Sequence, residues 1–301
     1  MMGIFFAFLT ALFFAISNIL IRKGMERSPE DNGVFMTLTV NILMLGVAAL
    51  GYRLLIESVP FSLTGFGWFI LAGIFTTFLG RTTLFKSIRL IGPTRGTAIK
   101  NSAPLFTILF AVTFFNERME GMALWGALLV LIGLFIQGYF MVRTEGEQSQ
   151  AAVKKDERVG YMIALLAALT FGLGQVFRKP GVDAFPDPFF GAFVSAVVAF
   201  VALTTLQSFK TNVKAQFIYQ IKNRNLYYAG AGVATGAAMI SFFTGITYIE
   251  VSYVSVIAAL EPLLTIILAT LFLKGKERIY KYTLWSAAIV FAGVILIVLY
   301  T

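Results

Sequence analysis

Three ionisable residues stand out because they lie far from the ends of long apolar stretches of the sequence: Arg81, Lys100 and Glu261. An ionisable side chain at the centre of a membrane-spanning helix costs about 2.5–3.5 kcal/mol and generally faces a cavity or an opposite charge. Since two cations accompany one acid, we expect a site for a substrate that carries a carboxylate or phosphate. Arg81 would be a two-pronged donor, Lys100 a point charge, and Glu261 a partner for a substrate amine or for Arg81. The alternative is an internal salt-bridge cluster that locks the helices together.

Counting residues places all three charges at a similar depth. Arg81 lies ten residues before Ile91 and Lys100 nine residues after it, so both are about 14 Å from that turn. Glu261 lies eleven residues after Glu250, about 16 Å from the opposite membrane face. In an apolar core about 30 Å thick, the three charges converge near the midplane. Proton coupling through Glu261 stays open, although a nearby Arg81 would keep that carboxyl group ionised.

Four uncharged polar residues in apolar stretches form a second group of candidate ligands: Asn18, Gln175, Asn101 and Asn41. Two of them, Asn18 and Gln175, occupy matching places in the two halves of the chain. Each of the four could instead form an interhelical hydrogen bond, which contributes about 1–2 kcal/mol or less in a membrane.

Four further residues are candidates for gating the cavity or bending its walls: Pro104, Pro262, Tyr248 and Tyr253. A proline inside a helix frees the carbonyl oxygen one turn earlier and bends the helix, here at Lys100 and Ala258. Such a kink suits a moving cavity wall, and the alternative is a static bend. The tyrosines flank a predicted turn, where they would close the cavity or anchor the helix ends at the membrane interface.

The elements that must position these residues are membrane-spanning helices. Of the 301 residues, 58% are hydrophobic and 13% are charged, about half the charged fraction of a soluble domain. Ten blocks approach the roughly 20 apolar residues that cross a bilayer. They cover 3–21, 34–56, 66–88, 94–115, 122–142, 160–177, 188–207, 226–249, 252–273 and 282–300. We predict an all-α integral membrane protein with ten transmembrane helices, the first of them retained rather than cleaved as a signal peptide.

The sequence contains no histidine and no cysteine, which excludes disulfides, cysteine nucleophiles, imidazole bases and the usual zinc ligand sets. We expect no catalytic residue, no metal and no cofactor. No Walker A motif is present, so nothing predicts ATP hydrolysis. The net charge of +9 indicates basic residues flanking membrane helices rather than nucleic-acid binding, because no basic stripe lies on a soluble segment.

The two halves of the sequence match each other at a shift of about 158 residues. Shared features are a proline, a Glu-Arg pair and a tryptophan, in the pairs Pro104 and Pro262, Glu117-Arg118 and Glu277-Arg278, and Trp125 and Trp285. We predict a first five-helix repeat at 1–142, a polar linker at 143–158 and a second repeat at 159–301. Because five is odd, the second copy would enter the membrane inverted, an arrangement that commonly gives alternating access around a midplane site.

Lysine and arginine are concentrated in alternate connections between the predicted spans. The connections after the even-numbered spans carry only Arg53, Arg118, Arg178 and Lys179. The positive-inside rule then places the more basic connections in the cytoplasm and both termini outside. We expect a multi-pass protein of a bacterial or archaeal plasma membrane, in contact with anionic lipid.

Residues 103–104 and 261–262, which read Ala-Pro and Glu-Pro, each precede an apolar run and a Glu-Arg pair. A segment beginning Trp-Gly-Ala or Trp-Ser-Ala follows. This pattern resembles the EamA module, and two modules in tandem resemble the drug/metabolite transporter superfamily. The resemblance implies a central cavity lined mainly by spans three, four, eight and nine. It also implies an exporter or exchanger of amino acids, related metabolites, drugs or sugar nucleotides. One departure is Ala103, because only the second module keeps the acidic residue.

We therefore expect a secondary transporter that exports or exchanges a small amphipathic or anionic metabolite, such as an amino acid, by alternating access around a central midplane cavity. Coupling to protons or to a counter-substrate stays open. A flippase for a lipid or lipid-linked sugar is the main alternative, and a lateral opening between spans would favour it. A membrane enzyme acting on lipid-linked substrates would need clustered acids or histidines at one interface.

Overall fold

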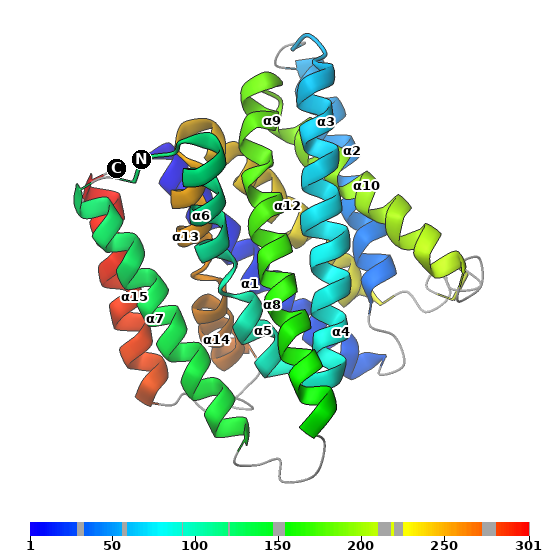
Figure 1. The fold of residues 1–301 in the computed structure, drawn as a ribbon. Coiled ribbons are helices and arrows are strands. Elements are labelled where there is room, and N and C mark those ends of the chain that lie inside the picture. The colour runs from blue at the N-terminus through cyan, green and yellow to red at the C-terminus, as the bar shows by residue number, and fades with distance from the viewer. Residues whose placement is uncertain are drawn as a thin grey trace.

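The computed structural model describes residues 1–28, 33–55, 59–91, 93–119, 121–146, 154–209, 218–219, 225–272 and 281–300. Within these residues the secondary structure is helical and contains no strand, which confirms the predicted all-α class. Figure 1 shows a bundle of helices with both chain ends at the same end of the bundle. The elements are α1 (Met2–Arg27), α2 (Val34–Leu55), α3 (Leu63–Ala72), η1 (Gly73–Gly80), α4 (Arg81–Ile91), α5 (Pro93–Lys100), α6 (Ala103–Phe115), α7 (Gly121–Gly146), α8 (Lys154–Val176), α9 (Arg178–Ala184), α10 (Pro188–Ser208), α12 (Leu226–Tyr248), α13 (Val251–Ala258), α14 (Glu261–Phe272) and α15 (Lys281–Tyr300).

Nine helical stretches among the described residues are long and apolar enough to cross a membrane. They are Met2–Arg27, Val34–Leu55, Leu63–Ile88, Arg95–Phe115, Gly121–Phe140, Glu157–Ala184, Pro188–Leu206, Leu226–Tyr248 and Val251–Phe272. Each coincides with one of the first nine predicted spans, and the tenth corresponds to α15, whose apolar part is shorter. The chain is a multi-pass membrane protein, and the count of ten crossings stays a prediction.

The first helix of each half packs against the other half. Helix α1 contacts α12, α13 and α14, whereas α8 contacts η1, α4 and α6. On α1, the fully buried residues Ala7, Ala11 and Ala15 recur every fourth position and so share one face. Small residues on one face let helices approach closely, which is how helices associate in lipid. The two halves therefore interlock around a common centre.

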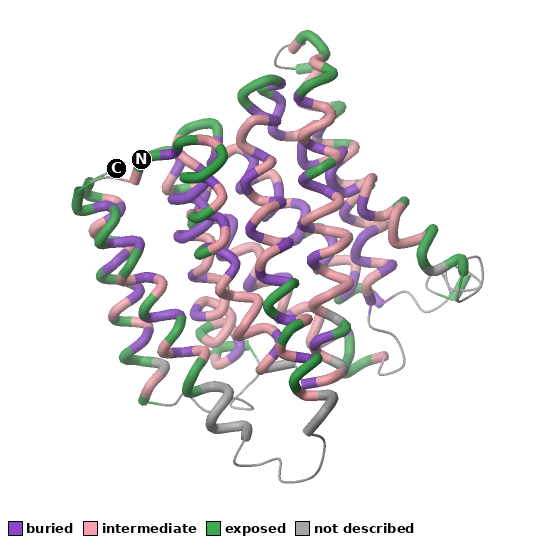
Figure 2. The backbone as a smooth tube through the Cα atoms, in the orientation of Figure 1, coloured by how far each residue is buried: buried purple, intermediate pink, exposed green. Residues whose placement is uncertain are grey.

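Helices α7 and α15 form a separate pair on one side of the bundle (Figure 1). Gly126 and Gly293 meet backbone to backbone, since a Cβ atom at Gly293 would lie 2.5 Å from the carbonyl oxygen of Gly126. Exposed positions recur along both helices (Figure 2), and the side chains of Trp125 and Trp285 are among the exposed large hydrophobic residues. An apolar outer face of this kind suits a lipid environment.

Two spans are interrupted at matching positions. Helix α5 gives way to α6, and α13 gives way to α14, each across two non-helical residues. The two breaks lie 158 residues apart, which equals the shift of the sequence repeat. Pro104 and Pro262 each occupy the second position of the new helix, where proline cannot donate a hydrogen bond back across the break.

The third span contains the π-helical segment η1 directly before Arg81. Its counterpart in the second half, α12, is a continuous α-helix. Because π segments are rare and occur frequently at functional sites, this asymmetry marks the region near Arg81.

The predicted linker at 143–158 is partly helical. Helix α7 extends to Gly146 and α8 begins at Lys154. Residues 147–153 lie outside the described residues, so the division of the chain at this linker stays a prediction.

Candidate substrate-binding site

Lys100 and Glu261 meet between the two helix breaks. The Lys100 Nζ atom lies 3.8 Å from Glu261 Oε2, and each side chain is about one-fifth exposed, at 20% and 21%. Lys100 is the last residue of α5 and Glu261 the first residue of α14. A cation at a helix C-terminus and an anion at an N-terminus each gain about 0.3–1 kcal/mol from the helix dipole. The two helix ends therefore favour the charges that they carry.

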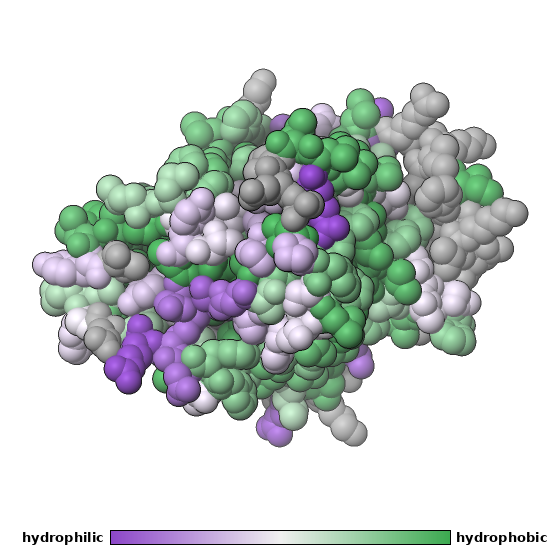
Figure 3. Space-filling model, turned by 90° about the horizontal axis from the view of Figure 1, so that it is seen from above, coloured by the Kyte–Doolittle hydropathy of each residue, from purple (hydrophilic) through white to green (hydrophobic). Residues whose placement is uncertain are grey.

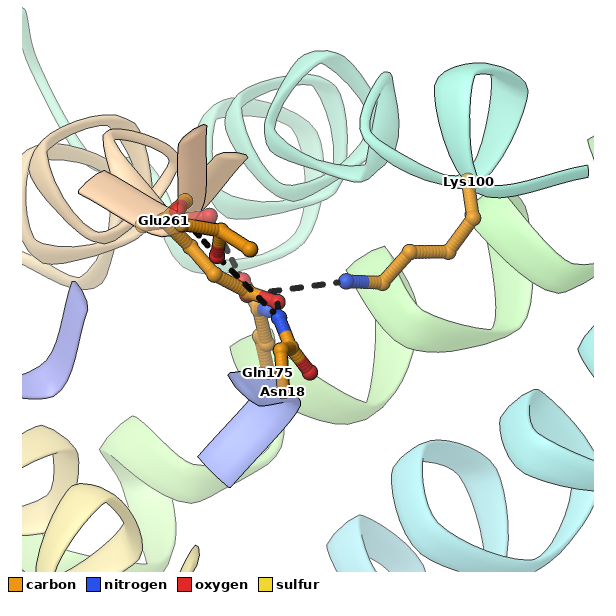
Figure 4. Close-up of polar contacts among 6 residues, drawn as sticks. Asn18, Lys100, Gln175 and Glu261 are labelled. Atoms are coloured by element: carbon orange, nitrogen blue, oxygen red, sulfur yellow. Dashed lines mark hydrogen bonds and ion pairs between the residues drawn. The ribbon is translucent and has the colours of Figure 1, made fainter. Parts of the chain in front are cut away.

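Asn18 of α1 holds the other oxygen of the Glu261 carboxylate. Its Nδ2 atom donates a hydrogen bond of 2.8 Å to Glu261 Oε1 and lies 3.4 Å from Thr265 Oγ1. Figure 4 shows Asn18 and Lys100 reaching Glu261 from different helices. Because a hydrogen bond to a charged group contributes about 1.5–3 kcal/mol, Asn18 fixes the orientation of this carboxylate.

Arg81 does not join this ion pair. Among the described residues, the half-buried Arg81 forms no hydrogen bond and no ion pair. The Lys100 ammonium instead lies 5.2 Å from the ring centre of Phe171 on α8, a cation–π contact. The same ring packs on Gly80, where a Cβ atom would lie 2.9 Å from it. Phe171 thus contacts both Lys100 and the residue preceding Arg81.

Gln175 of α8 belongs to a second polar cluster. Its Oε1 atom accepts hydrogen bonds from Ser255 Oγ at 2.5 Å and from Thr107 Oγ1 at 3.1 Å. Thr107 and Thr265 are 158 residues apart, so a side-chain amide contacts the equivalent threonine in each half. The structure therefore repeats this contact, whereas the carboxylate occurs in one half only.

Asn41 and Asn101 lie apart from both clusters. Asn41 is buried on α2, its Nδ2 atom is 3.6 Å from Met239 Sδ, and its Oδ1 atom is buried without a hydrogen-bond partner. Met239 is the counterpart of Arg81 in the sequence repeat. Asn101 lies in the break after α5, where its backbone N–H donates to the Thr97 carbonyl oxygen.

The sequence matches the profile of the EamA-like transporter family over residues 1–138 and 158–299. The chain belongs to the EamA-like transporter family. An uncharacterized transporter of Helicobacter pylori is 30% identical over 146 residues, which are 46% of this chain and 44% of that protein, so the match spans less than half of the relative. A crystal structure of another protein has a TM-score of 0.74 at 18% identity and covers 99% of this chain and 96% of that one. This likeness supports the fold alone.

Membership of the EamA-like transporter family makes the chain a membrane transporter and points away from an enzyme. The described residues contain no group of three or more acidic, histidine or cysteine residues that could hold a metal ion.

In this EamA-like transporter the two predicted tyrosines differ in exposure. Tyr248 ends α12, is 56% exposed and stacks on Phe6 of α1 at 6.1 Å between ring centres. Tyr253 on α13 is buried. Tyr248 is thus the one that covers the end of the bundle where the chain begins.

Arg178 of α9 is a buried charge that the sequence alone does not predict. Its guanidinium is 4.7 and 5.0 Å from the ring centres of Phe242 and Phe243, and its Nη2 atom donates to Thr76 Oγ1 at 3.3 Å. Its Nε atom is buried without a partner. Two adjacent phenylalanines, Phe242 and Phe243, are a sequence signal for a contact with a buried cation. The predicted span boundaries instead place Arg178 in a connection between spans.

Proposed function

We propose that this EamA-like transporter is a secondary transporter that exports or exchanges a small amphipathic or anionic metabolite such as an amino acid. The Lys100–Glu261 pair carries this proposal. Its 3.8 Å separation is at the long end for an ion pair, and both side chains keep some exposure. Such a pair can open to admit a ligand that satisfies both charges.

The chemistry of the two breaks suits a zwitterion. A substrate carboxylate would pair with the Lys100 ammonium, and a substrate amine with the Glu261 carboxylate. At the start of α6 the equivalent of Glu261 is Ala103, and the N-cap residue Ser102 provides no side-chain hydrogen bond. Among the described residues, no carboxylate of the protein therefore lies at this helix start, where the helix dipole favours an anionic group.

Alternating access is the mechanism that we propose for movement of the substrate. Discontinuous helices at equivalent positions of two halves, with charges at their ends, are the usual site architecture of inverted-repeat transporters. The equivalent breaks and the reciprocal packing of α1 and α8 support this mechanism. We further propose two inverted five-helix repeats, at 1–142 and 159–301, joined at 143–158.

Arg81 keeps a role in this proposal as a second cation of the pathway. It would meet the substrate in another conformation, because in the present one it has no partner among the described residues. The lysine-rich connections would face the cytoplasm of a bacterial or archaeal cell, with both termini outside.

The test begins with a thermal-shift panel of amino acids, phosphorylated metabolites and lipid headgroups on the purified protein. The best ligand is then measured for binding and for uptake into proteoliposomes by the variants Glu261→Gln and Lys100→Gln. We expect each to weaken binding by about 10- to 150-fold, the value of a charge-assisted contact. Glu157→Gln is the matched control, because Glu157 also pairs with a cation, Arg95 at 3.2 Å, but at a 43% exposed site.

Unchanged binding in both variants would exclude the Lys100–Glu261 pair as the site. Stabilisation by lipid headgroups alone would favour the flippase instead. Thiol labelling of single cysteines introduced at Gln148 and Thr301 tests the orientation, since the chain has no cysteine of its own.

A further inference from the structure

A second carboxylate site lies at the end of the bundle where α6 and α12 end. Glu117 follows Asn116, whose left-handed backbone (φ 51°) ends α6. The Glu117 side chain is 7% exposed and accepts hydrogen bonds from the backbone N–H groups of Val251 and Ser252, at 3.0 and 3.2 Å. The Ser252 hydroxyl donates a third, at 2.6 Å. A residue of the first half thus caps α13 of the second half.

Glu250 directly precedes α13 and lines the same pocket as Glu117, so it lies beside this cap. Two neighbouring carboxyl groups favour a proton on one of them, because two negative charges repel and a carboxylate has no hydrogen to donate. Glu117 already accepts from three donors, so Glu250 is the better placed of the two to take the proton. Burial raises the pKa of Glu250, and the hydrogen bond and negative charge of Glu117 raise it further, against a smaller lowering by Lys179.

Both carboxyl groups line a pocket of about 540 Å³. The other residues that line it are Phe115, Asn116, Arg118, Lys179, Pro180 and Asp183. Lys179 is 3.3 Å from Asp183 and donates to the Ile246 carbonyl oxygen, so its charge is shared with other partners. Asp183 is 58% exposed, which places the pocket at the surface, within reach of protons from solution. Figure 3 views this end of the molecule and shows hydrophilic residues gathered on an otherwise apolar surface.

We propose that Glu117 and Glu250 form a proton-binding site whose protonation holds this end of the transporter closed. The pair bridges the α6–α7 connection and the start of α13, so it joins the two halves that must separate for this end to open. This inference rests on the proposed alternating access. It assigns proton sensing to the end of the bundle and leaves Glu261 to the substrate.

The direction of the pH effect follows from linkage. In the closed form the pKa of Glu250 is raised, whereas separation from Glu117 and exposure to water would return it to the ordinary value of about 4.3. Stabilisation of the closed form is complete below that ordinary value and is lost as the pH rises through the raised value. Between the two values, the ratio of closed to open molecules falls about tenfold for each pH unit.

The test measures the distance between the two halves at this end, without any substrate. Spin labels are attached at Met122→Cys on α7 and Thr247→Cys on α12, both exposed positions. Pulsed electron paramagnetic resonance is recorded in nanodiscs from about pH 5 to about pH 8.5, a range that spans any raised glutamate pKa. We expect a short, narrow distance distribution at low pH and a growing longer component as the pH rises.

Two variants show which carboxyl group causes the pH dependence of the distance. In Glu250→Gln the neutral amide can still donate a hydrogen bond to Glu117, so we expect the short distance at every pH. Asp183→Asn is the matched control, because it removes another carboxyl group of the same pocket and should keep the wild-type pH dependence. Glu117→Gln is avoided, since it would also weaken the cap of α13.

A distance distribution that does not change with pH in the wild type overturns the proposal. So does a pH dependence that survives in Glu250→Gln or disappears in Asp183→Asn. Because no ligand is present, failure here leaves the substrate site untouched, and failure of Glu261→Gln to alter binding leaves this result untouched.

Discussion

Helix α5 ends in Lys100, whereas α13 ends at the equivalent position in Ala258. Across the break, α6 begins with Ala103 and α14 with Glu261. The backbones are the same, with two non-helical residues before a proline at the second position of the next helix. The charges are opposite in sign and lie on different breaks. The two halves therefore share the helix break, where a span can bend, and differ in the charged side chains that can bind a substrate.

The amide contacts beside the two breaks are also alike in position and different in chemistry. In each half an amide side chain reaches the equivalent threonine, from Asn18 to Thr265 and from Thr107 to Gln175. Only Asn18 also binds a carboxylate, whereas Gln175 accepts from the neutral hydroxyl of Ser255. The amide of the first half thus supports the charge of Glu261, whereas the amide of the second half joins neutral hydroxyl groups.

Moving the acidic residue from the second break to the first is expected to change ligand affinity the most. In the double variant Ala103→Glu with Glu261→Ala, the carboxylate leaves Asn18 and sits beside Lys100 on the same break. We expect ligand binding to weaken by about 10- to 150-fold, because the charge-assisted contacts of Glu261 are lost. Isothermal titration calorimetry checks this, with thermal unfolding as the control for assembly. Binding at wild-type strength would mean that the position of the acid does not matter.

Replacing the proline at either break is expected to change ligand affinity less than moving the acid does. In Pro262→Ala the new backbone N–H can bond to the carbonyl oxygen of Ala258, which straightens α14 and moves Glu261. We expect about tenfold weaker ligand binding, equivalent to one charge-assisted hydrogen bond. Pro104→Ala is the matched variant and should change binding less than about twofold, because Lys100 precedes that break and reaches the ligand through a long side chain. Equal losses of affinity would contradict this difference between the two breaks.

Removing the side-chain amide of Asn18 or Gln175 is expected to change ligand affinity the least. Asn18→Ala should weaken ligand binding by about three- to fifteenfold, the range of an interhelical hydrogen bond in a membrane. Gln175→Ala should leave binding unchanged and lower the melting temperature instead, because its partners are neutral hydroxyl groups of two packed helices, α6 and α13. The reverse pattern would place the ligand on the Gln175 side.

Hydropathy and residue counting predict the helical class, the first nine spans and the similar depth of Lys100 and Glu261, whose side chains meet. They could do so because depth in a membrane follows from helical rise alone. They gave the depth of Arg81 but not the direction of its side chain. The π segment η1 places more residues in each turn just before Arg81, so a 3.6-residue period no longer predicts which side it faces.

Two other residues were beyond the reach of the sequence. The apolar pattern predicts that the sixth span ends at residue 177, yet α9 continues to Ala184 and carries Arg178 inward, next to aromatic rings. In the sequence, Glu117 is part of a repeated Glu-Arg pair. Its partners Val251 and Ser252 lie more than 130 positions away, and only the fold brings them to the carboxylate.

The backbone contact between α7 and α15 also bears on how the molecule is made. Synthesis proceeds from the N-terminus, so α7 is already in the membrane when α15 leaves the ribosome. The close fit of Gly293 on Gly126 then gives α15 a packing surface on a helix that is already in place. Helix α7 of the first half therefore gives α15 of the second half a packing partner as soon as α15 enters the membrane.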